Sequence, residues 1–193
     1  MKIASIKKLC TDAHMCMIYE TGGARQWIGT MEAIYPADGL QIGKESIKTL
    51  FDMPDADSKM EIGVDDIFKS ELVPSDEETE MELAAWTELH SGLPIFYAGE
   101  KLYTMTHEGG ILFVQADYVK PAIRKNDYLV FKLARNGFGH PLIMIGNGLE
   151  VTGVAKPVPA KTAASIVKLM GEMSAYRADG SPDPVEWVEC GGG

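Results

Sequence analysis

The residues best suited to chemistry in this sequence are lysines and arginines in four short segments with helical patterns: residues 2–11, 43–51, 117–125 and 160–174. These segments hold ten of the chain's 18 lysines and arginines but only three of its 28 aspartates and glutamates. The formal net charge of the whole chain is −10. Basic helices in an acidic protein indicate one local surface for a polyanion. The predicted contacts with DNA phosphates are Lys7, Lys8, Lys44, Lys48, Lys120, Arg124, Lys125, Lys161 and Lys168.

The chemistry of these cations predicts contact with DNA that does not depend on base sequence. Lysines meet phosphates as mobile point charges, and such contact is sensitive to salt. Base readout would need arginine, asparagine or glutamine at the start of a recognition helix, and no segment offers that pattern. An ordinary alternative stays open for each helix, because lysines flank the apolar stripe of most surface helices.

Sequence motifs for catalysis are largely absent, so we expect a binding protein rather than an enzyme, without cofactor or metal. There is no P-loop, and the four histidines have no metal-ligand spacing. A metal-dependent enzyme remains an alternative, because paired acids can hold Mg²⁺. These pairs are Asp55 with Asp57, Asp65 with Asp66, and Glu77 with Glu78. Each lies in a turn or a charged run, which favours a solvated surface.

The three cysteines predict neither a disulfide framework nor a zinc site. Cys10, Cys16 and Cys190 form no CxxC pair, and their number is odd. We expect buried, reduced thiols in a cytoplasmic protein of a bacterial host cell. No apolar run reaches the length of about 18 residues that a membrane helix needs.

Apolar periodicity predicts an α+β fold of short elements. Ile3, Ile6 and Cys10 recur at helical spacing, whereas the residues around Gly22-Gly23 are typical of a hairpin. The predicted helices are 2–12, 43–51, 117–125 and 160–174. The predicted strands are 14–21, 25–35, 59–64, 101–106, 110–115, 127–133, 141–145, 149–154 and 185–190.

An acidic segment suggests how the chain is divided. Residues 76–88 hold six acids without a basic partner, which suits a connector over 75–92 between halves at 1–74 and 93–193. Equally, this segment could be a surface helix of a single domain. A repeat supports the two halves, because a strand, a basic helix, an acidic turn and a strand occur in 40–64 and again in 113–133.

The second half resembles a DNA sliding clamp, the ring-shaped processivity factor of replicative polymerases, over residues 110–158. The residues that carry this likeness are Leu112–Lys125, Tyr128–Leu133, Pro141–Ile145 and Leu149–Pro157. Residues 27–51 are also similar to uncharacterised prophage proteins of Firmicutes. The resemblance implies two similar halves, each with short helices on one face of antiparallel sheets.

The resemblance also implies a function. A phage or prophage clamp of this kind would encircle duplex DNA as a homo-oligomeric ring and tether a polymerase or another replication protein. The alternative is an acidic phage effector that mimics DNA and blocks a host defence nuclease. In that case the active surface would be the acidic residues 52–57 and 75–88.

Overall fold

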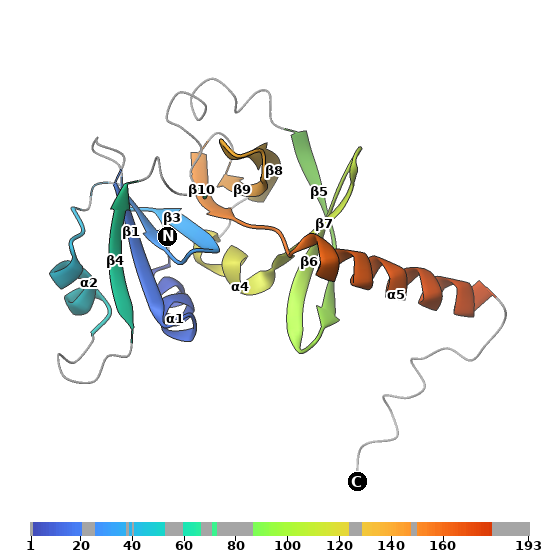
Figure 1. Cartoon of the computed structure of the whole chain (residues 1–193), viewed down its shortest axis with the longest axis horizontal. Helices are drawn as coiled ribbons and strands as arrows, with labels where there is room; N and C mark the ends of the chain where they lie inside the picture. The colour runs from blue at the N-terminus through green and yellow to red at the C-terminus, as the bar shows by residue number, and fades with distance from the viewer. Residues whose placement is uncertain are drawn as a thin grey trace, which may run out of the picture. The chain divides into compact units, whose positions relative to one another are not determined.

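The computed structural model describes residues 2–20, 26–37, 39, 41–52, 60–66, 71–72, 87–123, 129–147 and 150–178. Contacts divide the chain into a first unit, residues 1–157, and a second unit, residues 158–193. Among the described residues, the first unit is an α+β structure built on one mixed, mostly antiparallel sheet (Figure 1).

In the described part of the first unit, ten strands make up the sheet. Their order across the sheet is β4-β1-β2-β3-β10-β9-β8-β5-β6-β7. Neighbouring strands are antiparallel except β1 and β4, which are parallel. The strands are β1 (Met15–Glu20), β2 (Gln26–Gly29), β3 (Ala33–Pro36), β4 (Glu61–Asp66), β5 (Thr87–Tyr97), β6 (Glu100–His107), β7 (Gly110–Gln115), β8 (Leu129–Arg135), β9 (Pro141–Asn147) and β10 (Glu150–Ala155).

Short helices cover one face of this sheet. They are α1 (Ile3–Asp12), α2 (Lys44–Leu50), α4 (Ala116–Val119) and the 3₁₀ turn η2 (Lys120–Ala122). All four contribute to one core cluster, through residues such as Leu9, Ile47, Val119 and Ala122. Because side chains alternate between the faces of a strand, Tyr19, Trp27, Met144 and their neighbours form a separate cluster on the other face.

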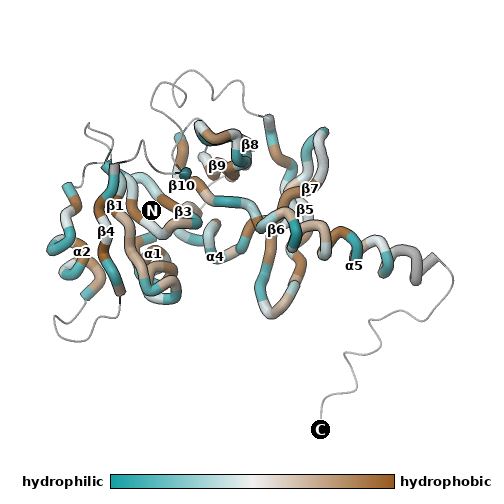
Figure 2. The backbone as a smooth tube through the Cα atoms, viewed as in Figure 1, coloured by the Kyte–Doolittle hydropathy of each residue, from teal (hydrophilic) through white to brown (hydrophobic). Residues whose placement is uncertain are grey.

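The buried positions of α1 follow from its helical spacing. Ile6, Leu9 and Cys10 are buried, while Lys8 and Thr11 are exposed. Figure 2 shows hydrophobic and hydrophilic residues interspersed along the helices and strands, as expected of elements with one buried side. The sequence predicted this helix over residues 2–12, and α1 spans Ile3–Asp12.

The predicted pair of similar halves is not supported by the described residues. Both parts of the chain enter one sheet, because β3 pairs with β10. The predicted repeat also fails at its start, since Gln41 and Ile42 lie in no strand. Instead, the backbone of Ile42 is hydrogen-bonded to the side chain of Gln26. The Oε1 atom of Gln26 accepts from Ile42 N at 2.6 Å, and its Nε2 donates to Ile42 O at 3.2 Å.

Two further predictions differ in detail. The second strand of the predicted N-terminal hairpin is broken into β2 and β3, because Thr30 Oγ1 accepts hydrogen bonds from the backbone N–H groups of Glu32 and Ala33, both at 3.2 Å. Strand β5 was not predicted. Most of the proposed acidic connector and the strand 185–190 lie outside the described residues, so the boundaries at 74 and 93 remain predictions.

The second unit contains helix α5 (Ala160–Ala178), which was predicted over 160–174. Its backbone begins with a hydrogen bond from Ala163 N to Pro159 O at 3.0 Å. Pro159 thus lies just before the helix, where its missing N–H costs nothing. No helix in the described ranges has both the length and the apolar character to span a membrane.

Candidate nucleic-acid interface and an adjacent cavity

Helix α1 presents the first two predicted DNA contacts. Lys7 is half-buried and Lys8 is exposed. Lys8 Nζ lies 2.8 Å from Asp12 Oδ2, one helical turn later. This hydrogen bond and the charges of Asp12 and Asp117 raise the pKa of Lys8, so it remains protonated at neutral pH. The ammonium group is available as a cation, but it already has a partner.

Helix α2 presents the next pair. Ile47 and Phe51 are fully buried against the sheet, and this orients the opposite side of the helix toward solvent. Lys44, the first residue of the helix, is exposed, and Lys48 Nζ lies 2.9 Å from Glu45 Oε1. Both lysines therefore reach solvent, and Lys48 is paired with an acid.

The fifth cation of the described set is Lys120 in η2, which pairs with Asp117 of α4. This turn lies next to the start of α1, since Lys2 N donates to Pro121 O at 3.0 Å. Helices α1 and α4 are also in contact, and the charge of Asp117 acts on Lys8. Arg124 and Lys125 were predicted in the same group, but they lie outside the described residues.

The last two predicted contacts belong to the second unit. Lys161 and Lys168 are exposed on α5, and Lys168 Nζ lies 3.7 Å from Glu172 Oε1. The structure therefore places five of the nine predicted cations on short helices of the first unit whose buried residues share one core cluster. We call these five the helix-layer lysines: Lys7, Lys8, Lys44, Lys48 and Lys120.

The acid partners of these lysines can be read from the sequence, although the predicted DNA surface did not take them into account. Lys8–Asp12 has (i, i+4) spacing, and Glu45–Lys48 and Asp117–Lys120 have (i, i+3) spacing, so each pair meets on one helix face. Asp12 lies one residue beyond the segment 2–11, which itself contains no acid. Surface pairs of this kind contribute little to stability and exchange readily with other ions.

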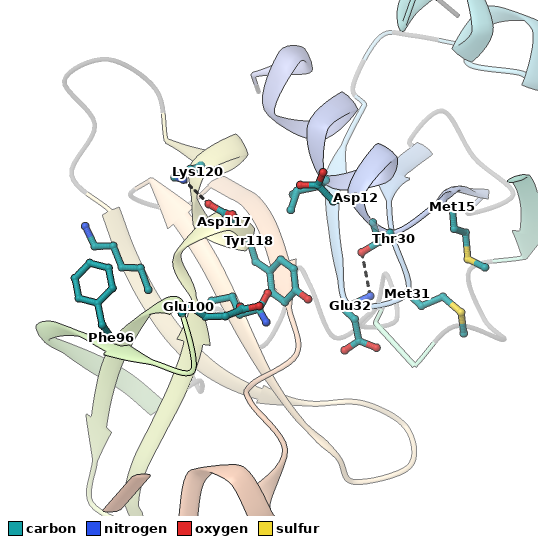
Figure 3. A pocket seen from close by; sticks show the side chains of 15 residues that line it. Asp12, Met15, Thr30, Met31, Glu32, Phe96, Glu100, Asp117, Tyr118 and Lys120 are labelled. Atoms are coloured by element: carbon teal, nitrogen blue, oxygen red, sulfur yellow. Dashed lines mark hydrogen bonds and ion pairs between the residues drawn. The ribbon is translucent and has the colours of Figure 1, made fainter. Parts of the chain in front are cut away.

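A cavity of about 650 Å³ opens between the helical layer and the β5–β6 hairpin (Figure 3). Its walls come from α1, the β2–β3 turn, the β5–β6 turn and α4–η2. The lining includes four acids, two lysines, two aromatic residues and two methionines. These residues are Asp12, Glu32, Glu100, Asp117, Lys101, Lys120, Phe96, Tyr118, Met15 and Met31.

Tyr118 is the residue on which the acids of this cavity converge. Partial burial, followed by the charges of Glu32, Glu100 and Asp117, raises the pKa of its phenol to about 12. Its backbone carbonyl accepts a 2.6 Å hydrogen bond from the hydroxyl of Tyr35. The phenol is therefore a neutral hydrogen-bonding group at physiological pH, surrounded by negative charge.

Sequence reasoning did not find this cavity. Glu32, Glu100 and Tyr118 come from separate parts of the chain, and no spacing rule connects them. A weak signal existed in the short turns that carry Glu32 and Glu100, since loops between strands often carry binding residues. The acid pairs that the sequence singles out are all consecutive or closely spaced, unlike Glu32 and Glu100.

The other chemical candidates do not assemble into a site within the described ranges. There, no three or more histidines, cysteines, aspartates or glutamates stand close enough to hold a metal ion. Cys10 and Cys16 are both buried as free thiols. A hydrogen bond with Cys16, together with burial, raises the pKa of Cys10, which makes this thiol a poor nucleophile.

The acidic segments of the DNA-mimic alternative fall almost entirely outside the described residues. Asp52 is described and exposed at the end of α2, and Thr87 and Glu88 begin β5. No structural observation favours that alternative. Compared with protein-family models, curated proteins and solved structures, the chain matches none of them.

Proposed function

We propose that this protein binds duplex DNA through phosphates, in the manner of a phage or prophage sliding clamp. The observation that supports this is the common placement of the helix-layer lysines. Helices α1, α2 and α4–η2 pack on one face of a single sheet, and each carries an exposed lysine. A layer of lysines without base-reading side chains suits contact that permits sliding.

The ion pairs within the helices are compatible with this proposal. Lys8, Lys48 and Lys120 each pair with an acid at the solvent-exposed surface. A DNA phosphate can replace such a carboxylate partner, because exposed pairs exchange freely with solvent and ions. The acids that remain weaken the attraction, and the phosphate contacts themselves make binding dependent on salt.

Encirclement by a chain of this size requires several copies. The outermost strands of the described sheet are β4 and β7. Each carries a partly exposed large apolar residue, Val64 at 43% and Ile111 at 39% exposure. Pairing β4 of one copy with β7 of the next would cover both edges, and repetition of this head-to-tail contact closes a ring.

In this proposal the face of the sheet opposite the helices is the outer surface of the ring. A polymerase or another replication protein would be tethered there, in the cytoplasm of a bacterial host. The protein acts as a binding partner and carries out no reaction itself, which agrees with the lysines being the main functional groups of the helical layer.

Retention on circular DNA tests the proposal. A ring that encircles duplex stays on a nicked circular plasmid at high salt and is lost when the plasmid is made linear, because it slides off the ends. Gel filtration of the protein with each DNA form measures this, and light scattering measures the copy number. A monomer, or equal retention on circular and linear DNA, contradicts the ring.

A further inference from the structure

Apart from Lys120, the proposed contact with DNA phosphates uses no residue that lines the cavity beside Tyr118. Acids outnumber lysines in it by four to two. Phosphates are repelled by such a surface, so the cavity calls for a ligand of the opposite charge. Its volume of about 650 Å³ lies within the range of small-molecule sites.

The cations near the cavity leave its centre negative. Lys120 pairs with Asp117, and Lys101 Nζ lies 5.8 Å from the ring centre of Tyr103. Asp12 is paired with Lys8. Asp12 and Asp117 are therefore each hydrogen-bonded to a lysine, whereas Glu32 and Glu100 have no such hydrogen bond within the described residues.

Glu32 and Glu100 are the carboxylates available to a ligand. Glu32 Oε1 lies 3.7 Å from Lys156 Nζ, but the same ammonium is closer to Glu71 Oε2, at 3.2 Å. Glu100 makes no ion pair within the described part of the chain. Both carboxylates line the cavity together with Tyr118, on whose phenol their charges act, and they come from different turns.

Apolar side chains complete the site. Met31 is 54% exposed and Phe96 is 76% exposed, although both line the cavity. In Figure 3 they come from opposite walls, with Tyr118 and Glu100 between them. Exposed large apolar residues around a polar centre are typical of a binding site rather than of plain surface. They offer contact to an aliphatic chain.

We propose that this cavity binds a primary alkylammonium ion, with its ammonium group between Glu32, Glu100 and the Tyr118 hydroxyl and its methylene chain against Met31 and Phe96. An ammonium group has three donors and no acceptor, which matches two carboxylates and a phenol oxygen. The aromatic rings add attraction for a cation. This assignment goes beyond the DNA function and does not depend on it.

Calorimetric titration with 1,5-diaminopentane tests the site directly. The diamine is expected to bind with one site per chain, and 1,5-pentanediol, which has the same length but no charge, is expected not to bind. Glu100→Gln and Glu32→Gln should each weaken binding by roughly ten-fold, because a charge-assisted hydrogen bond is lost. Thermal unfolding of each variant checks that the fold is kept.

A matched control separates the site from general attraction to an acidic protein. Glu108→Gln removes an exposed carboxylate in the β6–β7 turn, outside the cavity lining, and should leave the affinity unchanged. If Glu108→Gln weakens binding as much as Glu100→Gln, or if the diol binds as well as the diamine, the site is refuted. Absence of binding by the diamine at millimolar concentration refutes it as well.

The same assay distinguishes two sources of the ammonium group. Nα-acetyl-lysine methylamide represents a lysine side chain of a protein, and 1,5-diaminopentane represents a free amine. Binding of the lysine derivative, and its loss on Nε-acetylation, assigns the site to a lysine side chain. Binding of the diamine alone assigns it to a free amine, and either result supports the proposal.

Discussion

The hydroxyl of Tyr35 donates a 2.6 Å hydrogen bond to the backbone carbonyl of Tyr118, 83 residues later in the chain. Tyr35 is fully buried on β3, and Tyr118 lies in α4. The bond therefore fixes part of the helical layer to the middle of the sheet. It links the proposed DNA surface, through η2, to the cavity around Tyr118.

Replacing Tyr35 with phenylalanine tests this link. Tyr35→Phe keeps the ring but leaves the Tyr118 carbonyl without its donor, so we expect the free energy of unfolding to fall by about 1–3 kcal/mol. Urea unfolding followed by circular dichroism measures the change. Tyr97→Phe is the control, because Tyr97 is only half-buried at the end of β5. Equal stability of Tyr35→Phe and the wild type contradicts the importance of this bond.

Alkaline pH provides a second test of the same region. Burial raises the pKa of Tyr35 above its ordinary value, and that of Tyr118 is raised to about 12. Below pH 10 both phenols are neutral in the folded and unfolded states, and their contribution to stability is complete. Above pH 10 the unfolded chain ionises first, so the free energy of unfolding should decrease as pH rises toward 12.

The change with pH is measured by urea unfolding between pH 8 and 11. Tyr35→Phe should show a smaller decrease than the wild type, since it lacks one of the two phenols. Identical pH dependence of the two proteins contradicts the burial of the Tyr35 hydroxyl.

Glycine at position 29 is required by close backbone packing. A Cβ at this position would lie 2.1 Å from the carbonyl oxygen of Ala33 and 2.8 Å from the Cα of Ile34. Because both atoms belong to backbone, Gly29→Ala should destabilise the protein by about 1–3 kcal/mol. Gly137→Ala is the control, since a Cβ there meets nothing within 4 Å. Thermal unfolding distinguishes them, and equal melting temperatures contradict the predicted clash.

Asn136 holds the turn between β8 and β9. Its buried Oδ1 accepts from the N–H groups of Phe138 and His140 at 3.0 and 2.9 Å, and its Nδ2 donates to Glu71 O at 2.8 Å. Asn136→Ala should therefore lower the free energy of unfolding by about 2 kcal/mol. Asn136→Asp keeps both acceptor bonds and should lose less when measured by urea unfolding. A larger loss in Asn136→Asp than in Asn136→Ala contradicts this role of the amide.

The elements that could be predicted from the sequence are those whose own residues determine their structure. Helices α1 and α5 were found because apolar residues recur at helical spacing. Strand β5 was missed because Gly92 and Pro94 interrupt it, and most of its side chains are exposed. It exists through pairing with β6 and β8, with a bulge between Ser91 and Pro94. Pairing between distant segments leaves little trace in local sequence.

The same distinction applies to the candidate sites. The helix-layer lysines could be predicted because each stands beside an apolar stripe that places its helix on the sheet. Their shared face was not predictable, since it depends on the order of strands between α1 and α4. The cavity around Tyr118 could not be predicted for a related reason: Glu32 and Glu100 line the same cavity only once β3 and β6 are placed in the sheet.

The measurement that tests the central claim most directly is the affinity of lysine variants for a fluorescent duplex over a series of salt concentrations. Lys44→Gln removes an exposed cation of the helical layer. Lys132→Gln removes a half-buried cation of β8, on the opposite face of the sheet, where Lys132 lies across from Met144 of β9 in the strand register. Each phosphate contact contributes about 0.9 to the slope of log K against log salt.

The account predicts that Lys44→Gln weakens binding and lowers the slope by about 1, and that Lys132→Gln does neither. Replacing all five helix-layer lysines with glutamine should lower the slope by up to about 4.5 and nearly abolish binding at physiological salt. If the five-fold variant binds duplex as tightly as the wild type, with the same salt dependence, these lysines are not a DNA surface.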